Sequence, residues 1–375
     1  VEPTASMGVD TPLAVMSEKH QSLFSYFKQL FAQVTNPPID SLREKIVTDT
    51  TVYVGKDGNL LEPDGKNCRV LEINNPILTG TDLIKIAALN QNGLKAKTLS
   101  ILFELGGQGL ACVIDNLFAQ IDQAYADGYN IIILSDRGLD KNHAAIPAIL
   151  AVSAVEQHLV RTKKRTSISI ILESAEVRDV HQAAMCLGYG ARAVNPYLAH
   201  EAIAELIDQK ILDKDYHTAI DDYNKGIING IVKIAAKMGI STIQSYQSAQ
   251  IFEAVGIAGD VIEKYFTNTV SRVGGVGLKE IEEDVLYHHN QGFDPNGLTV
   301  NQHLDSVGNH KLRMGPSAES HLYNPQTIVA LQQATRNGDY QRFKAYTALV
   351  DSNEHPHTLR AMLDFDYAAG SEISI

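Results

Sequence analysis

The pattern of apolar and polar positions first predicts a helix near the amino terminus. Within residues 17–34 the apolar positions recur at helical spacing, namely Leu23, Phe24, Phe27, Leu30, Phe31 and Val34. Ser17 precedes them as an expected helix cap. The helix should stop in VTNPPID, because proline cannot continue a helix. Turn signals such as KDGN and PDG follow, so we expect residues 1–67 to form an N-terminal arm with this one amphipathic helix.

From residue 68 the pattern changes to short β-rich runs that alternate with helical periods, which is typical of parallel βαβ units. The candidate strands are residues 69–73, 98–105, 130–135, 167–173, 192–196 and 241–245, with a weaker one at 269–273. The candidate helices are residues 110–127, 144–161, 177–187 and 216–238. Six or seven strands with crossover helices suit either an incomplete TIM-barrel-like (β/α) domain or a doubly wound open sheet. We expect this α/β domain to span residues 68–285, and residues 286–375 to form a loop and a helical connector.

Composition and charge then narrow the classes of function. At 375 residues and 44% hydrophobic content, the chain can bury a large core without disulfides or metal. Its 44 acidic residues against 32 basic ones give a net charge of -12, which argues against nucleic acid and anionic membranes as partners. No apolar stretch approaches the roughly 18 residues of a spanning helix. The chain begins with Val1 rather than Met, so we expect a piece of a longer protein.

The cysteines and histidines offer no metal-ligand pattern. Three cysteines, Cys68, Cys112 and Cys186, are odd in number, widely spaced and without a CxxC pair, which favours a reducing cytoplasm over a disulfide framework. None of the thirteen histidines makes the HExxH spacing that places two imidazoles on one helix face. We therefore expect no metal site in this chain.

Two turns resemble phosphate-binding turns without completing the pattern. The expected strand 98–105 runs into GGQGLAC, but Cys112 stands where a dinucleotide fingerprint needs its third glycine. In ILESAEVRD the turn after the strand is Ser174-Ala175-Glu176, where a carboxylate would repel a phosphate and no glycine would admit it. We interpret both as structural turns, although whether the second one binds any ligand stays open.

One pair of charged residues stands where α/β proteins place function. Asp136 and Arg137 in ILSDRG follow directly after an expected strand, at the carboxyl end where functional groups gather. Adjacent opposite charges also simply cap turns, so both readings remain. No nucleophile with a base beside it can be named from the residues alone.

Several segments in order along the chain resemble one family. MGVDTPLAVMS, FKQLFAQVTNPPIDSLRE, ILSDRG, GYGARAVNPYLAHEAI, KMGISTIQSYQSAQIFEAVG and FTNTVSRVGGVGL are similar to the central domain of the glutamate synthase large subunit. The resemblance runs from about residue 7 to about residue 350. It implies a domain related in outline to flavin barrels, without catalytic, cofactor-binding or metal-binding residues of its own.

The resemblance also implies partners outside this chain. The family enzyme is an oxidoreductase that converts glutamine and 2-oxoglutarate into two glutamates in nitrogen metabolism. Its glutaminase domain carries a catalytic N-terminal cysteine, and its FMN domain holds FMN and an iron-sulfur cluster. We therefore expect this chain to be an inactive scaffold between those two domains. The electron donor of the parent enzyme, NADPH, NADH or ferredoxin, and the oligomeric state stay open.

The segment before the two prolines is the candidate ammonia-channel element. In this family the threonine of the motif is associated with the channel entrance, which makes Thr35 and then Asn36 the candidates here. Pro37 and Pro38 supply a stiff backbone. The bland interpretation is a rigid elbow whose polar side chains satisfy the end of the preceding helix. The alternative function for the whole chain is a free-standing nucleotide- or flavin-dependent oxidoreductase.

Overall fold

The computed structural model describes residues 9–30, 38–59, 61–293, 307–309, 311–315, 318–351 and 356–363. The chain divides into two compact units. One comprises residues 22–299, and the other joins residues 1–21 to residues 300–375. The larger unit holds the sheet and most of the core, and it is described first.

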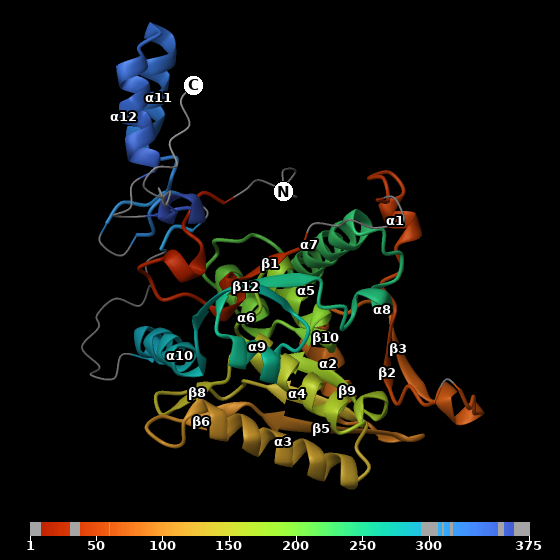
Figure 1. The fold of residues 1–375 in the computed structure, drawn as a ribbon. Helices are drawn as coiled ribbons and strands as arrows, with labels where there is room; N and C mark the ends of the chain where they lie inside the picture. The colour runs from red at the N-terminus through yellow and green to blue at the C-terminus, as the bar shows by residue number, and fades with distance from the viewer. Residues whose placement is uncertain are drawn as a thin grey trace. The chain divides into compact units, whose positions relative to one another are not determined.

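A five-stranded sheet in the order β10-β9-β7-β5-β4 forms the centre of the larger unit (Figure 1). Its strands are β4 (Asn90–Gln91), β5 (Leu94–Ser100), β7 (Ile131–Ser135), β9 (Ser169–Glu173) and β10 (Ala191–Asn195). The last four run parallel, and only β4 is antiparallel. Every residue of β7 and β9 is buried, as expected for strands that are covered on both faces.

Helices follow the parallel strands as crossover connections. They are α3 (Leu110–Ala126), α4 (Ala148–Arg161), α5 (Val180–Gly188) and α6 (Tyr197–Asp208). A small antiparallel pair, β6 (Leu102–Glu104) with β8 (His143–Ala145), extends the turns beside α3 and α4. Helix α4 buries 11 of its 14 residues, so it lies inside the unit rather than on its surface. This repetition of βα units without closure confirms the predicted incomplete barrel-like α/β fold.

A second sheet, β1-β11-β12, completes the larger unit. Its strands are β1 (Phe27–Gln29), β11 (Phe252–Ile257) and β12 (Val270–Val276), with β1 antiparallel and β12 parallel to β11. Four fully buried rings, those of Phe27, Tyr189, Phe252 and Phe266, pack together, with the Phe27 and Phe266 centroids 4.9 Å apart. The remaining helices of this part are α7 (Tyr216–Lys237), α8 (Ile243–Tyr246), α9 (Gly259–Tyr265) and α10 (Leu278–Phe293).

The residues before the sheet form an arm of short elements. It contains α1 (Glu44–Val47), β2 (Val52–Gly55), β3 (Val70–Ile73) and α2 (Gly80–Ala87), and β2 pairs with β3 antiparallel. The 3-10 turns are η2 (Leu23–Tyr26) and η3 (Gly65–Cys68) in the arm and η4 (Arg165–Ser167) before β9. After the arm, Ile77 forms an isolated parallel β-bridge with Val194 of β10.

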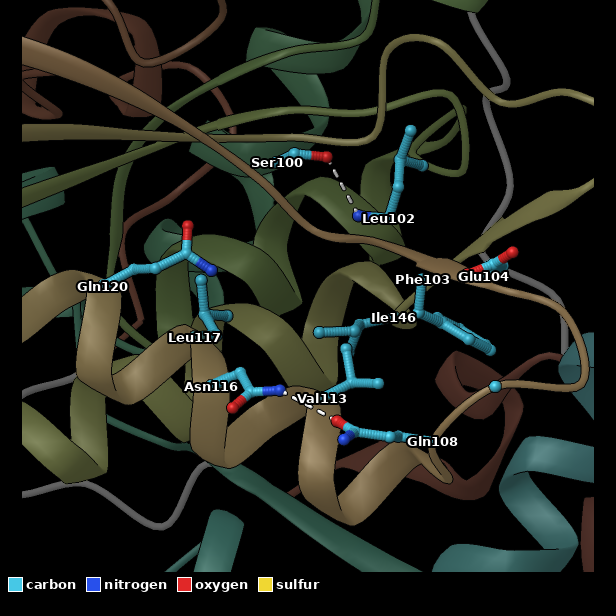
Figure 2. A pocket seen from close by; sticks show the side chains of 11 residues that line it. Ser100, Leu102, Phe103, Glu104, Gln108, Val113, Asn116, Leu117, Gln120 and Ile146 are labelled. Atoms are coloured by element: carbon cyan, nitrogen blue, oxygen red, sulfur yellow. Dashed lines mark hydrogen bonds between the residues drawn. The ribbon is translucent and has the colours of Figure 1, made fainter.

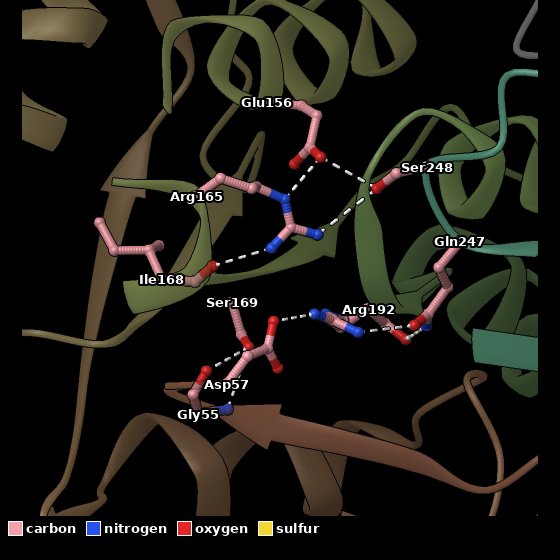
Figure 3. A network of polar contacts seen from close by, with 9 residues as sticks. All are labelled: Gly55, Asp57, Glu156, Arg165, Ile168, Ser169, Arg192, Gln247 and Ser248. Carbon is pink, nitrogen blue, oxygen red and sulfur yellow. Dashed lines mark hydrogen bonds and ion pairs between the residues drawn. The ribbon is translucent and has the colours of Figure 1, made fainter. Parts of the chain in front are cut away.

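A polar network fastens this arm to the amino end of the parallel sheet (Figure 3). Arg192 of β10 binds the Asp57 carboxylate at 2.6 Å, and the Ser169 hydroxyl of β9 donates to the Gly55 carbonyl at 2.8 Å. On the other side of the sheet Arg165 pairs with the buried Glu156 of α4 at 2.5 Å. Two charge pairs therefore lie near each other, and one buried atom of each pair, Glu156 Oε2 and Arg192 Nε, has no hydrogen-bond partner among the described residues.

Three predicted elements are corrected by the structure. The helix expected within residues 17–34 is wrong: η2 and β1 stand there, because Phe27 enters the aromatic cluster and its backbone pairs with β11. The strand expected at 241–245 is wrong as well, since α8 buries Ile243 and Tyr246 at a spacing of three residues. The loop expected from residue 286 is wrong for residues 286–293, because α10 continues to Phe293.

Two further strands differ from the prediction: one pairs in another sheet, and one was missed. The expected strand 69–73 is present as β3, but it pairs in the arm rather than in the parallel sheet. Strand β11 was not predicted, although its buried positions Phe252, Ala254 and Gly256 alternate with half-buried ones and carry a period-two signal. Among the strands of the parallel sheet, the predicted ranges at 130–135, 167–173 and 192–196 match β7, β9 and β10 within two residues.

The smaller unit joins the first described residues to the carboxyl-terminal helices. The Asp10 carboxylate lies 2.9 Å from the His321 ring, and the Ser17 hydroxyl donates to Glu319 at 2.6 Å. Its elements are η1 (Ala14–Met16), α11 (Pro325–Asn337), α12 (Tyr340–Val350) and η5 (Leu359–Met362). The helices α11 and α12 lie within residues 286–375, where a helical connector was expected. In the described part of the chain, every helix is too short or too polar to cross a bilayer.

Gly190 offers a test of the close packing between α5 and β10. Its φ of +127° is unfavourable for other residues, and a Cβ placed there would lie 2.7 Å from a carboxylate oxygen of Glu156. We expect Gly190→Ala to lower the free energy of unfolding by about 3 kcal/mol, measured by urea denaturation. Gly226→Ala, in the exposed interior of α7 with open space around it, should instead raise it by about 0.5–1 kcal/mol. Equal effects of the two variants would contradict the packing argument.

Candidate functional site

The carboxyl edge of the parallel sheet brings three strand ends together. Ser135 of β7 lies beside Glu173 of β9, and Glu173 lies beside Asn195 of β10. The residues that follow these strands therefore share one edge, which is where α/β barrels and open sheets carry their functional groups. This edge is the candidate functional site.

Asp136 is buried at this edge and is held by three donors. It is 3% exposed, and it accepts hydrogen bonds from the Ser174 hydroxyl at 2.9 Å and from the Ala175 N–H at 2.9 Å. The Tyr197 hydroxyl also donates to it. Burial raises the pKa of Asp136 above its usual value, and the three hydrogen bonds offset this shift only in part. Burial also raises the pKa of Tyr197, so its phenol stays protonated.

Arg137 is half exposed and faces two carboxylates and one ring. Its guanidinium lies 2.7 Å from Glu173 and 2.9 Å from Glu201, and it stacks 3.9 Å from the centre of the Tyr197 ring. The second oxygen of Glu173 accepts from the Ser135 hydroxyl at 2.5 Å. Arg137 thus pairs with two carboxylates at the rim of the edge and offsets one of their two negative charges.

Glu176 occupies the amino terminus of α4. Its carboxylate accepts from the Ala148 N–H at 2.9 Å and from the Ser22 hydroxyl at 3.0 Å. The residue before α4 is Pro147, which provides no side-chain cap, so a distant carboxylate satisfies the first turn of the helix. Burial raises the pKa of Glu176.

The turn after β9 does not fit the phosphate group of a cofactor. The N–H groups that a phosphate would use already donate to protein oxygens, Ala175 to Asp136 and Glu176 to the Ser174 hydroxyl. At α5, which follows the turn, a reciprocal cap between Asp179 and Gln182 satisfies the first N–H groups. A phosphate at this place would meet carboxylates rather than free donors, which agrees with the reading of Ser174-Ala175-Glu176 as a structural turn.

The GGQG turn does not fit a pyrophosphate either. The Leu110 N–H, at the first position of α3, donates to the Glu282 carboxylate of α10 at 2.9 Å. Gly106 takes a positive φ of +72°, which explains its glycine as a turn requirement. A dinucleotide would have to displace Glu282 from the place that its phosphates need.

Of the four candidate site residues predicted from the sequence, the structure describes two. Thr35 and Asn36 lie outside the described residues. Asp136 and Arg137 are both at the carboxyl edge, where they meet Glu173, Tyr197 and Glu201, which were not predicted. Glu173 had a signal in the sequence, since it is a carboxylate that directly ends an apolar strand run. Tyr197 and Glu201 had none, because they belong to the next βα unit.

The described residues offer neither a metal-binding cluster nor a reactive thiol at this edge. In the residues that the structure describes, no group of three or more His, Cys, Asp or Glu side chains is placed to hold a metal ion. The three cysteines are free, with Cys186 buried and the other two exposed. Burial raises the pKa of the Cys186 thiol well above its usual value, which keeps it an unreactive core residue.

Comparison with known proteins gives one consistent family. The family described as the glutamate synthase central domain matches residues 1–258. The chain is 43% identical over 365 residues to the glutamate synthase [NADPH] large chain of Bacillus subtilis, covering 97% of this chain and 23% of that one. It is 38% identical over 380 residues to glutamate synthase [NADH] of Schizosaccharomyces pombe, covering 100% and 18%. Ferredoxin-dependent glutamate synthase 2 of Synechocystis is 36% identical over 391 residues, covering 97% and 24%.

The chain therefore spans about a quarter or less of the length of these relatives. Among solved structures, a flavocytochrome b2 mutant with pyruvate bound superposes with a TM-score of 0.36 at 10% identity, covering 72% of this chain and 88% of that one. A second flavocytochrome b2 mutant, with benzoylformate, gives a TM-score of 0.31 at 15% identity, covering 53% and 47%.

The raised pKa of Asp136 predicts a specific pH dependence. A carboxyl group whose folded pKa exceeds its unfolded value stabilises the fold most below the unfolded value of about 3.8, and this contribution is lost as pH rises through the folded pKa. The cost of Asp136→Asn in free energy of unfolding should therefore shrink as pH rises from about 4 to about 8, measured from urea midpoints.

Asp215→Asn is the matched control. Hydrogen bonds from Thr218 lower the pKa of Asp215 at the start of α7, so the cost of its replacement should grow with pH instead. If the cost of Asp136→Asn also grew with pH, the carboxyl group would not be the buried acid described above.

Proposed function

Because the chain belongs to the family of glutamate synthase central domains, we propose that it is the non-catalytic central domain of a glutamate synthase large chain. In the proposed parent enzyme, glutamine is hydrolysed in one domain and the released ammonia travels inside the protein to a flavin domain. There it is added to 2-oxoglutarate, and the resulting imine is reduced to glutamate. The chain acts as a scaffold between the two reacting domains.

The observation that carries this proposal is the occupation of the carboxyl edge by the chain's own groups. Asp136 takes the donors of the turn after β9, and Glu176 takes the amino terminus of α4. Arg137 is engaged by Glu173 and Glu201. A barrel-like domain whose usual cofactor edge is filled in this way is suited to holding neighbours in place rather than to reacting.

The neighbours in this proposal are other domains of the same polypeptide. A glutaminase domain and an FMN domain with an iron-sulfur cluster supply the catalytic groups. We propose residues 68–285 as the barrel-like body, residues 1–67 as the arm and residues 286–375 as the connector towards the FMN domain. Strand β3 pairs with β2 across the first of these bounds, and α10 crosses the second. The net charge of -12 argues against nucleic acid and anionic membranes as partners. We propose a cytoplasmic location for the parent enzyme.

We also propose that Thr35 and Asn36 border the ammonia path. The described residues on both sides of their segment are fixed to the body: the Leu30 N–H donates to the Ile251 carbonyl at 3.2 Å, and the Ile39 N–H to the Ala236 carbonyl at 2.9 Å. These anchored flanks, together with the stiffness that two consecutive prolines give a backbone, support the proposal.

The alternative is a free-standing nucleotide- or flavin-dependent oxidoreductase. It would need phosphate-binding groups at the GGQG turn or at the turn after β9. Glu282 already accepts from the start of α3 after the GGQG turn, and the reciprocal cap of Asp179 and Gln182 already satisfies the start of α5 after β9. The alternative therefore ranks second, and direct binding measurements separate the two.

We expect the purified chain to be colourless, to bind no FMN in equilibrium dialysis and to release no ammonia from glutamine. FMN should not bind because the candidate phosphate donors are already bonded within the protein. Glutamine should not be hydrolysed because none of Cys68, Cys112 and Cys186 takes the place of the family's amino-terminal catalytic cysteine. Binding of FMN in the micromolar range, or measurable glutamine hydrolysis, would restore the oxidoreductase alternative. A glutamate synthase of full length serves as the positive control in both assays.

In the full-length enzyme, we expect Thr35→Leu to reduce glutamine-dependent glutamate formation by about tenfold or more, while ammonia-dependent formation survives. A larger apolar side chain at the mouth would obstruct a small polar molecule but leave the flavin reaction intact. Thr35→Ser, which keeps the hydroxyl, is the control and should retain both activities. Equal loss of both activities in Thr35→Leu would indicate a folding defect, and no loss would remove Thr35 from the path.

A further inference from the structure

The polar side chains that line the groove beside the GGQG turn do not point to one place (Figure 2). The Asn116 amide donates to the Gln108 side chain at 3.1 Å, whereas Glu104 is turned away at the other end of the groove. In the smaller unit, by contrast, buried charged side chains from distant parts of the sequence meet within hydrogen-bond distance. The segments that meet there are residues 10–21 and 307–323.

His321 fastens residue 10 to residue 308. Its Nδ1 lies 2.9 Å from the Asp10 carboxylate, and its Nε2 lies 2.7 Å from the Gly308 carbonyl oxygen. The residue is 6% exposed, so water competes little for either contact. A carbonyl oxygen and an ionised carboxylate can only accept hydrogen bonds, so each ring nitrogen must carry a proton to satisfy both. The ring is therefore an imidazolium paired with Asp10.

Asp10 is held as an anion by its surroundings. Burial acts to raise the pKa of Asp10, but hydrogen bonds from His321 and from the Tyr323 N–H, together with the charge of His321, leave that pKa below its usual value. The Tyr323 N–H lies 3.1 Å from the second carboxylate oxygen, and the Leu322 N–H donates to the Asp10 carbonyl at 3.0 Å. Side chain and backbone of Asp10 are thus both fixed by three consecutive residues.

Glu319 holds the same segments through a second buried charge. It is 5% exposed and lies two positions before His321. Its carboxylate accepts from the Ser17 hydroxyl at 2.6 Å and from the Gln21 amide at 3.3 Å. Its N–H donates to the Val307 carbonyl at 2.7 Å. Both neighbouring segments are therefore bonded to one short stretch of chain.

This stretch leads into α11 without slack. Helix α11 begins at Pro325 with a reciprocal cap between Asn324 and Thr327. The Thr327 hydroxyl also donates to the Leu322 carbonyl at 2.7 Å, and Thr327 is 3% exposed. The start of α11 is thus fixed relative to Asp10, although the ion pair that links them joins residues 311 positions apart.

We propose that the ion pair of Asp10 and His321 is a positioning contact that ties together the segments before and after the larger unit in the sequence. This inference rests on the proposed function, in which a glutaminase domain precedes this chain and an FMN domain follows it. Both neighbours then continue from one rigid unit, which keeps the route between them at a fixed length. His321 touches no substrate, and it acts on ammonia transfer only through the placement of the two domains.

Nitrogen NMR of the histidine rings in the purified 375-residue chain tests the contact itself. We expect both ring nitrogens of His321 to carry protons at neutral pH, because both face acceptors. The signals are identified by their loss in His321→Gln. A His321 ring with one bare nitrogen would overturn the proposal.

In a full-length glutamate synthase that contains this chain, His321→Gln should reduce glutamine-dependent glutamate formation about fivefold or more. Ammonia-dependent formation should stay unchanged and free ammonia should appear in the medium, because each domain still reacts but the transfer between them is impaired. Asp10→Asn removes the charge but keeps an acceptor for the Tyr323 N–H, so it should give a smaller loss of the same kind. The double variant should lose no more than His321→Gln alone, since both changes break one contact.

His158→Gln is the matched control, because the His158 ring lies 2.9 Å from the Asp122 carboxylate within the larger unit. It should leave the coupling of the two activities unchanged. Equal loss of the glutamine-dependent and ammonia-dependent activities in His321→Gln, or additive losses in the double variant, would contradict a positioning role. An unsubstituted enzyme that forms no glutamate from glutamine and 2-oxoglutarate would refute the proposed function and this inference together. An active enzyme that His321→Gln leaves unaffected would refute this inference alone.

Discussion

The buried carboxylate of Glu176 is the contact on which the arrangement of the carboxyl edge depends. It lies in the turn after β9, and its partners are Ala148 at the start of α4 and Ser22, which directly precedes η2. Three segments that are distant in sequence therefore meet at one charged group. The helix start needs a negative partner and the carboxylate needs donors, so burial becomes tolerable for both. The position of β1, and with it the second sheet, follows from this contact and from the aromatic cluster around Phe27.

The same logic explains why a barrel-like edge can lack a ligand without becoming unstable. Strand ends expose N–H groups, and in a folded protein such groups must find acceptors. Here Asp136, Glu176 and Glu282 are those acceptors, each supplied from another element. Burying these carboxyl groups disfavours their charged form, so the pKa values of Asp136 and Glu176 are raised. Arg137 offsets part of the negative charge at the rim of the edge. An edge with this many internal partners favours a structural role.

The sequence was sufficient where a local pattern decided the structure. The apolar runs of β7 and β9, and the absence of glycine at Ser174-Ala175-Glu176, predicted buried parallel strands and a turn unsuited to phosphate. The sequence was not sufficient where contacts with residues distant in the chain determine the local structure. Residues around Phe27 have helical spacing, but pairing with β11 outweighs that preference. Glu176 was recognised as a carboxylate in a turn, yet nothing local reveals that Ala148 and Ser22 are its partners. The role of Thr35 remains a prediction.

The link between Asp57 and Arg192 has a consequence for the order in which the protein is made. The two residues are separated by 135 positions, so Asp57 leaves the ribosome on the order of 10 s before its partner at ordinary rates of synthesis. Until then the hairpin of β2 and β3 has no sheet end to attach to, although Val52 and Val54 must eventually be fully buried. The arm is therefore made first and docked late. Until β9 and β10 have been synthesised, Val52 and Val54 lack the cover that they have in the folded chain.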